Sequence, residues 1–259
     1  MKLLKTKIFG MNFWYREDDK FIGQRIALGK YEEYETLLME YQLKGKDVVV
    51  DVGANIGYYT LLMATKAKKV YALEPDQTCF EILKKNVEEN KLKNVVLLNV
   101  AAGAKKEIKK LIKDSENLGN SHLGSGKGVS VNCERLENIL INEHKIDLIK
   151  IDTQGWEPAV IEGAKKVIES DRPVLFLEYS PTEYRDKKMK KYLELVYRNI
   201  WSIDYWYYVC KKGIHINKKS GYTDLWIKDK MTASDYWWTI KEIRIKKVIK
   251  QIAASLRFS

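Results

Sequence analysis

The chain has 259 residues, 45% of which are hydrophobic, and a formal net charge of +11. This length can bury one sizeable core, and no Gly/Ser-rich or Pro-rich stretch marks a linker, so we expect one α/β domain with appendages. The three cysteines are widely spaced and lie outside any CxxC pattern, which argues against a disulfide framework and a structural zinc site.

The distribution of charge bears on compartment and partners. Charges interrupt the apolar runs of residues 1–19, and nowhere do 18 apolar residues run together, so we expect a cytoplasmic protein without a signal peptide or membrane span. The positive net charge indicates an anionic partner but does not distinguish nucleic acid, phospholipid and a phosphorylated substrate.

The N-terminal segment, residues 1–46, predicts a cap for the sheet or for one side of a pocket. Residues 7–28 predict a short hairpin that turns at Glu17–Lys20, and residues 31–43 predict a helix. Four apolar or aromatic residues share one face of that helix: Tyr34, Leu37, Leu38 and Tyr41.

From residue 47 onward, short runs rich in Val and Ile alternate with segments of helical period. The predicted strands are 47–52, 69–74, 94–100, 147–152 and 173–179, and the predicted helices are 57–67, 76–90, 157–169 and 182–198. Aromatic runs at 201–210 and 222–227 predict a closing antiparallel hairpin. We therefore predict a doubly wound, mostly parallel, Rossmann-like α/β core over residues 47–230.

The stretch VVVDVGANIGYYT predicts a ligand site, because a buried strand passes there into a helix through a glycine-rich turn. Glycine lets the backbone bend sharply and approach a ligand, and open parallel sheets bind ligands at the C-terminal ends of their strands. The candidate cofactor-binding residues of this turn are Asp51, Gly53, Ala54, Asn55 and Gly57. Close packing of helix on strand is the alternative explanation of the glycines.

The ends of the next two strands strengthen the prediction of a nucleoside site. Glu74, followed by Pro75, ends the second strand about twenty residues after the turn, where a carboxylate can accept hydrogen bonds from ribose hydroxyls. Asn99, Val100 and Ala101 lead into the small-residue run AAGA, which leaves room for adenine or simply forms a turn. The third glycine of GxGxxG is missing, which argues against a nicotinamide dehydrogenase.

These motifs resemble the FkbM-like family of S-adenosyl-L-methionine-dependent methyltransferases. The resemblance covers roughly residues 47–180 and rests on VVVDVGANIGYYT, ALEPD, NVAAG and, above all, IDLIKIDTQGWEPAVIEGA followed by PVLFLEY. It implies a seven-stranded fold, S-adenosyl-L-methionine as donor, S-adenosyl-L-homocysteine as product, and methylation of a hydroxyl, often on a sugar or natural product. Gln154 stands where the family usually has Glu, which removes one carboxylate from the acceptor side.

Methyl transfer to a hydroxyl requires an oriented acceptor and a proton acceptor. Asp152 ends the fourth strand and is the first candidate base, with capping of the next helix as its alternative. Glu157 is a second candidate and would equally suit the first turn of that helix. The residues expected to bind the acceptor are Asn120, Gln154, Trp156 and Glu178, where Trp156 can stack on a sugar or pack in the core.

Residues 114–128 form a polar, glycine-rich stretch that we expect to be a loop covering the acceptor site. It contains His122, a candidate base near neutral pH or an exposed bystander. Asp152, Glu157 and Glu178 are the side chains that could gather a Mg²⁺, but we expect no metal.

The tail, residues 231–259, is basic. As a helix, residues 240–257 would carry an apolar face of Ile245, Val248, Ile249, Ile252 and Leu256 opposite Lys246, Lys247, Lys250 and Arg257. Such a helix suits an anionic membrane surface, or it packs on the body or on another subunit. On the first interpretation, residues 240–259 bring the enzyme to a lipid-linked acceptor at the inner face of the membrane.

The function that these observations favour is O-methylation of a sugar, a glycan or a related polyhydroxylated metabolite. One alternative is an RNA-modifying methyltransferase, which the charge and the aromatic content suit. No appended RNA-binding module and no NPPY-like tetrapeptide is present, so we expect neither RNA nor DNA as a partner. The other alternative is a non-catalytic protein that keeps the cofactor pocket as a scaffold.

Overall fold

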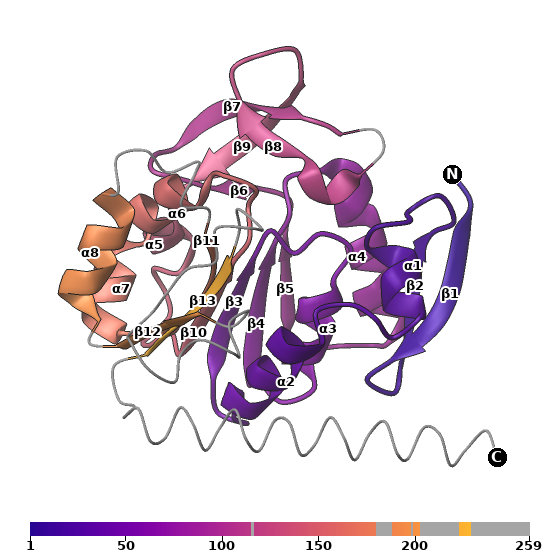
Figure 1. Cartoon of the computed structure of the whole chain (residues 1–259), viewed down its shortest axis with the longest axis horizontal. Helices are drawn as coiled ribbons and strands as arrows, with labels where there is room; N and C mark the ends of the chain where they lie inside the picture. Colours follow the sequence, from indigo (N-terminus) through magenta and orange to yellow (C-terminus); the bar gives the residue numbers. More distant parts are fainter. Residues whose placement is uncertain (115–116, 180–187, 198, 203–222, 229–259) are drawn as a thin grey trace.

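The computed structural model describes residues 1–114, 117–179, 188–197, 199–202 and 223–228 (Figure 1). The predicted tail at 231–259 lies outside these residues, as do parts of the predicted segments 182–198 and 201–210. No helix within the described ranges is long and apolar enough to cross a membrane.

A seven-stranded sheet, in the order β12-β13-β11-β10-β3-β4-β5, forms the centre of the fold. Its strands are β3 (Val48–Val52), β4 (Lys69–Leu73), β5 (Val95–Leu98), β10 (Leu148–Ile151), β11 (Val174–Tyr179), β12 (Asn199–Ser202) and β13 (Thr223–Lys228). β13 runs antiparallel to the other six strands, which confirms the doubly wound, mostly parallel sheet. β13 matches the strand predicted at 222–227 and pairs with β12, but of the strand predicted at 201–210 only residues 201 and 202 are described. The strand order reverses between β3 and β10, where such sheets bind ligands.

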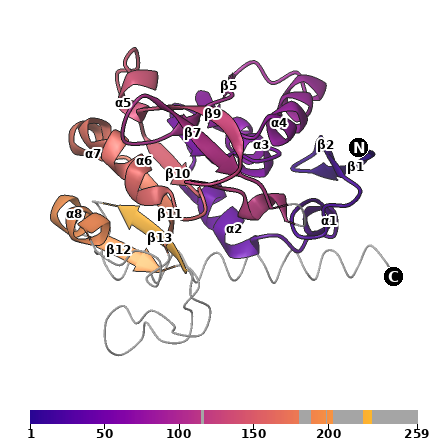
Figure 2. The same cartoon turned by 90° about the horizontal axis from the view of Figure 1, so that it is seen from above.

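Helices cover both faces of this sheet. One face holds α2 (Glu33–Gln42), α3 (Tyr58–Ala64) and α4 (Gln77–Glu89); the other holds α5 (Leu136–Ile139), α6 (Glu157–Gly163), α7 (Lys165–Asp171) and α8 (Lys188–Val196) (Figure 1; Figure 2). The helix predicted at 157–169 is thus two helices that meet at Ala164. Both faces of β3 are buried, since Val48, Val50 and Val52 pack toward α5–α8 while Val49 packs toward α2 and α3.

The N-terminal hairpin turns earlier than the sequence pattern predicts. Strands β1 (Leu3–Ile8) and β2 (Met11–Arg16) are joined at Phe9 and Gly10, whose φ angles of 51° and 79° suit a two-residue hairpin turn. The charged stretch at 17–20 instead precedes the short helix α1 (Gly23–Ala27), where the Asp19 carboxylate accepts hydrogen bonds from two backbone N–H groups at 3.0 Å. The chain does turn at Glu17–Lys20, where the Asp19 N–H lies 3.2 Å from the Arg16 carbonyl oxygen, but this turn leads into α1, so the predicted position of the hairpin turn is wrong.

The helix predicted at 31–43 is present as α2, but its buried face differs in part. Leu37 and Leu38 are buried as predicted, whereas Tyr41 is 44% exposed. The buried stripe continues through Met39 and Leu43 instead. The side chain of Tyr34 is not among those the structure describes.

Asn86 of α4 and Asn90, the C-cap residue of that helix, hydrogen-bond to the backbone of the hairpin. Asn86 is fully buried; its Oδ1 accepts from the Trp14 N–H at 2.6 Å, and its Nδ2 donates to the carbonyls of Trp14 and Ile56. Asn90, one turn later, makes the same paired contacts with the backbone of Asn12. The hairpin is thereby held beside the β3–α3 turn, because Ile56 belongs to that turn.

A second sheet, in the order β6-β9-β7-β8, lies beyond the ends of the central strands (Figure 1). It consists of β6 (Ala101–Ala102), β7 (Glu107–Ile112), β8 (His122–Gly124) and β9 (Val129–Glu134), and a single 3₁₀ turn, η1 (Leu118–Asn120), precedes β8. The segment predicted as a loop at 114–128 therefore contributes β8 to this sheet, and part of it also borders the cavity described next.

Candidate active site

A cavity of about 270 Å³ lies at the C-terminal ends of β3, β4 and β10, roofed by the second sheet and walled by the N-terminal segment. The predicted site residues that line it are Gly53, Ala54, Asn55, Glu74, Pro75, Val100, Ala101, Asn120, Asp152, Gln154, Trp156 and Glu178. Those that do not line it are Asp51, Gly57, Asn99, His122 and Glu157. Most of the predicted cofactor residues and all of the predicted acceptor residues thus border one continuous space.

The glycine turn is shaped by a contact between two loops. Gly53 has a φ of 78°, and a Cβ at this position would lie 1.9 Å from the carbonyl oxygen of Asp152. Only glycine allows the β3–α3 turn to approach the β10–α6 turn this closely. Asn55 follows with a φ of 50° and donates its backbone N–H to Glu74 Oε2 at 2.8 Å.

Glu74 is 7% exposed and faces the cavity. Each of its carboxylate oxygens accepts one backbone N–H, Oε2 from Asn55 and Oε1 from Asp76 at 2.7 Å. Burial raises the pKa of Glu74 to about 7, and the two N–H groups offset part of that effect. Since each oxygen has a second lone pair, the carboxylate can still accept two hydroxyl hydrogen bonds. Asn99 steadies this turn by donating to the Glu74 carbonyl at 2.8 Å.

Asp51 of β3 does not line the cavity, although Val52 and Gly53, which follow it, do. It is fully buried, and its Oδ2 accepts from Thr60 Oγ at 2.6 Å while its Oδ1 has no hydrogen-bond partner. The ammonium of Lys150 lies 3.9 Å from that Oδ1. Burial raises the pKa of Asp51, and the positive charge of Lys150 opposes the increase.

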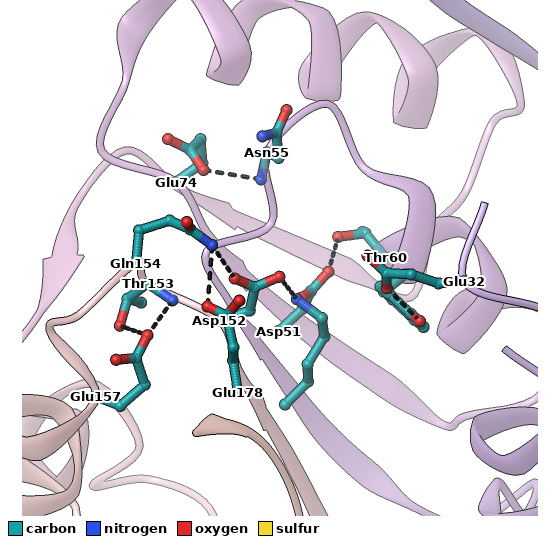
Figure 3. A network of polar contacts seen from close by, with 12 residues as sticks. Glu32, Asp51, Asn55, Thr60, Glu74, Asp152, Thr153, Gln154, Glu157 and Glu178 are labelled. Atoms are coloured by element: carbon teal, nitrogen blue, oxygen red, sulfur yellow. Dashed lines mark hydrogen bonds and ion pairs between the residues drawn. The ribbon is translucent and has the colours of Figure 1, made fainter. Parts of the chain in front are cut away.

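Three polar side chains from the ends of β10 and β11 meet at the cavity wall (Figure 3). The amide nitrogen of Gln154 donates to Asp152 Oδ1 at 3.0 Å and to Glu178 Oε2 at 2.9 Å, so it joins the two carboxylates. Gln154 adopts a φ of 53°, an uncommon conformation for a residue with a side chain. Burial is the largest single effect on the pKa of Asp152 and would raise it. The charge of Lys150, 3.2 Å from Oδ2, and the side-chain hydrogen bonds to Gln154 and Glu178 together outweigh burial, so the pKa is lowered.

Two of the predicted residues, Glu157 and His122, lie outside the cavity, and Trp156 lines it while also packing against the core. Glu157 is fully buried at the start of α6, and its Oε1 accepts from both the N–H and the hydroxyl of Thr153, so it shapes the loop (Figure 3). His122 is exposed, with Nδ1 3.3 Å from the Asn120 carbonyl oxygen. Neither side chain reaches the cavity. Trp156 packs against the core, and its Nε1 lies near Gly103, beyond the third strand.

The sequence pattern missed several residues of the site. Glu32 accepts a hydrogen bond from Tyr59 at 2.7 Å, and burial, reinforced by Asp152, raises its pKa. It lines the cavity together with Tyr59, Lys150 and the exposed Arg25. Glu32 and Arg25 come from the N-terminal segment, whose place in space no local motif indicates. Within the described part of the chain, no group of three His, Cys, Asp or Glu side chains could hold a metal.

The cavity has the features that S-adenosylmethionine requires. Glu74 can accept hydrogen bonds from a ribose, the small side chains of Val100 and Ala101 border the neighbouring space, and Gly53 brings backbone to its edge. Asp51, in the strand that leads into this turn, has a buried Oδ1 without a hydrogen-bond donor, 3.9 Å from the Lys150 ammonium. These residues fit a nucleoside joined to an amino acid.

The sequence matches the methyltransferase FkbM domain family over residues 51–205. The methyltransferase sdnD of Sordaria araneosa is 26% identical over 159 residues, covering 47% of this chain and 61% of that protein. The tRNA(Phe) (4-demethylwyosine(37)-C(7)) aminocarboxypropyltransferase of Methanocaldococcus jannaschii is 46% identical over 52 residues, covering 19% of this chain and 21% of that protein. The chain spans 23%, 21% and 18% of the lengths of the first three curated relatives.

Among solved structures, the methyltransferase FkbM from Methylobacillus flagellatus KT aligns with a TM-score of 0.47 at 16% identity, over 71% of this chain and 44% of that one. The family assignment therefore rests on the match over 51–205, which includes the glycine turn, Glu74 and the Asp152–Gln154 turn. This chain belongs to the methyltransferase FkbM domain family, and its cofactor is S-adenosylmethionine.

Proposed function

We propose that the protein transfers the methyl group of S-adenosylmethionine to a hydroxyl of a sugar, a glycan or a related polyhydroxylated metabolite. The observation that carries the proposal is the joined set of Asp152, Gln154 and Glu178, which opens into the same cavity as Glu74 and the glycine turn. Carboxylates and amides on one wall suit an acceptor with several neighbouring hydroxyls, because each can hold a different hydroxyl.

The cofactor end is assigned to the turns of β3 and β4. Glu74 would bind the ribose, and Val100 and Ala101 would border the adenine, while the β3–α3 turn at Gly53 would face the amino-acid end. When bound there, S-adenosylmethionine supplies an electrophilic methyl group. The task of the chain is then to orient the acceptor oxygen and remove its proton.

Asp152 is the proton acceptor in this proposal. As the new O–CH₃ bond forms and the S–CH₃ bond breaks, positive charge develops on the acceptor oxygen, and its proton passes to the carboxylate of Asp152. A carboxylate with a lowered pKa suffices, because the hydroxyl proton becomes strongly acidic while the bond forms. Gln154 and Glu178 hold the acceptor end together, and S-adenosylhomocysteine leaves as the second product.

The test uses radiolabelled S-adenosylmethionine with nucleotide sugars, glycosides, lipid-linked oligosaccharides and unmodified RNA as separate acceptors. We expect label in a hydroxyl acceptor that survives mild alkali, as an ether does, and Asp152→Asn should lower its rate by about 10²–10⁴-fold. S-adenosylhomocysteine affinity should change little in that variant. Label that mild alkali releases would identify a methyl ester and contradict hydroxyl methylation.

RNA is the second candidate acceptor. Some partial matches are named for RNA substrates, including a tRNA(Phe) enzyme and an RNA methyltransferase, at 46% and 37% identity over 52 and 81 residues. Label that enters only RNA, and is lost with ribonuclease, would replace the sugar proposal.

We also propose that residues 240–259 bring the protein to anionic membranes and thereby to a lipid-linked acceptor. The proposal is supported by the basic and apolar residues of this sequence alone. Flotation with vesicles containing anionic lipid should be lost when 240–259 is deleted, and flotation that is unchanged would refute it.

A further inference from the structure

Lys150 is a buried cation at the centre of the acceptor end, and the proposed reaction gives it no role. It lies on β10, directly paired in the sheet with Asp51 of β3 and with Phe176 of β11. Its residue is 8% exposed, and no other lysine or arginine of the described chain is buried. A buried ammonium is costly unless carboxylates compensate for its lost hydration, so its neighbours define its role.

Charged and titratable groups reach Lys150 from each surrounding element. Its Nζ lies 3.2 Å from Asp152 Oδ2, 3.9 Å from Asp51 Oδ1 and 5.0 Å from the ring centre of Tyr59 on α3. Glu32, the N-cap residue of α2, interacts with it electrostatically, and Glu178 of β11 lines the same cavity. Glu35 of α2 borders an adjoining hollow together with Lys150 and Asp152.

We propose that Lys150 is a positioning residue that keeps Asp152 ionised and fixes its Oδ2, so that the carboxylate presents a defined edge to the acceptor hydroxyl. This inference rests on the proposed role of Asp152. Gln154 holds the other oxygen, Oδ1, at 3.0 Å. Asp152 is thus held by a different donor on each oxygen, which fixes the plane of the carboxylate.

The charges explain why an ammonium is needed at this position. Two further carboxyl groups lie near Asp152. Gln154 hydrogen-bonds to both Asp152 and Glu178, and the negative charge of Asp152 raises the pKa of Glu32. Without Lys150, like charges would favour protonation of one carboxylate. In keeping with this, the pKa of Asp152 is lowered although burial alone would raise it, whereas the pKa values of Asp51 and Glu32 are raised.

The ionisation of Asp152 can be measured without an acceptor, by ¹³C NMR of the full-length protein labelled at aspartate side-chain carboxyls. Asp152→Asn identifies the signal. In the wild type we expect no titration of this carboxyl between pH 4.5 and 8, and in Lys150→Met a titration that has moved up by at least about one pH unit, into that range. Lys150→Arg should retain the wild-type behaviour.

A second neutral variant, Lys150→Gln, serves if Lys150→Met does not fold, because it keeps a hydrogen-bond donor near Oδ2 without the charge. An Asp152 carboxyl that stays ionised down to pH 4.5 in a folded neutral variant would overturn the proposal. So would an upward shift in Lys150→Arg as large as that in Lys150→Met.

The positioning role has its own readout in turnover. The acid limb of the pH–rate profile should move to higher pH in the neutral variants and return in Lys150→Arg. An NMR shift without a matching shift of the acid limb would overturn the positioning role. Failure of the wild type to methylate any hydroxyl acceptor would refute the proposed function alone, since the NMR titration does not depend on it.

Discussion

Gly53→Ala tests why glycine is required at this position. Glycine could be needed only for the left-handed backbone conformation, or also for the close contact between the β3–α3 turn and the β10–α6 turn. The φ of Gly53 is 78°, nearly that of Gly10 at 79°, but a Cβ at Gly10 would meet nothing within 4 Å. Gly10→Ala should therefore cost only the backbone term, about 1–2 kcal/mol of unfolding free energy. A Cβ at Gly53 would lie 1.9 Å from the Asp152 carbonyl oxygen, so one turn must move.

That displacement resembles overpacking of a core, which adds about 1–3 kcal/mol, for a total of about 2–5 kcal/mol in Gly53→Ala. Denaturant unfolding of both variants measures the difference, and calorimetric titration with S-adenosylhomocysteine measures its effect on the site. We expect Gly53→Ala to lose at least tenfold in affinity and Gly10→Ala to bind normally. Equal losses of stability with equal affinities would refute the claim that the turns must touch.

Three further predictions concern a pH effect, a buried amide and a histidine. Because the pKa of Glu74 is raised from 4.5 to about 7, the folded protein retains a proton that the unfolded chain releases. The free energy of unfolding should therefore fall as the pH rises from 4.5 to about 7, by up to about 3 kcal/mol. In Glu74→Gln, denaturant unfolding at a series of pH values should show no such decrease. Asn86→Ala leaves three backbone groups without a partner and should cost about 3 kcal/mol of unfolding free energy, against less than about 0.5 kcal/mol for Lys84→Ala on the exposed side of α4. His122→Ala should keep the methylation rate within about twofold, because the imidazole is exposed outside the cavity; a larger loss in a folded variant would restore it as a candidate base.

The central sheet was predictable because burial on both faces leaves a strong local signature. Each of the five parallel strands predicted from 47 to 179 contains a run such as VVVDV or VLFLEY, and the structure places each within three residues of its predicted bounds. The helix predicted at 157–169 shows the limit of this reasoning. Its apolar period continues past Ala164, so the break between α6 and α7 leaves no mark in the hydrophobic pattern.

The second sheet left a weaker signature. Strand β7, EIKKLI, carries three charged residues and is only partly buried, and β9, VSVNCE, is mostly exposed or half-buried. Polar and apolar residues alternate in such strands, as they do in any strand with one face in water. The two strands are stabilised by pairing with each other, and that pairing depends on their register. The glycines and serines between them therefore indicated a loop. The Phe9–Gly10 turn was missed because the polar residues at 17–20 gave the stronger turn signal, although they precede a helix.

Lys150 shows why part of the candidate site could not be predicted. In the sequence it is one polar residue within a buried strand, and Asp152 two positions later shares its face of the sheet. Its pairing with Asp51, however, joins residues 99 positions apart and depends on the register of β10 against β3. A shift of one residue would point Lys150 toward the apolar core beneath α5–α8, where no carboxylate of the site could compensate its charge. The register that buries Val49 and Leu148 toward α2 therefore also brings the Lys150 ammonium to its carboxylates. The hydrophobic pattern of each strand sets this ion pairing only through the way in which β10 and β3 pair.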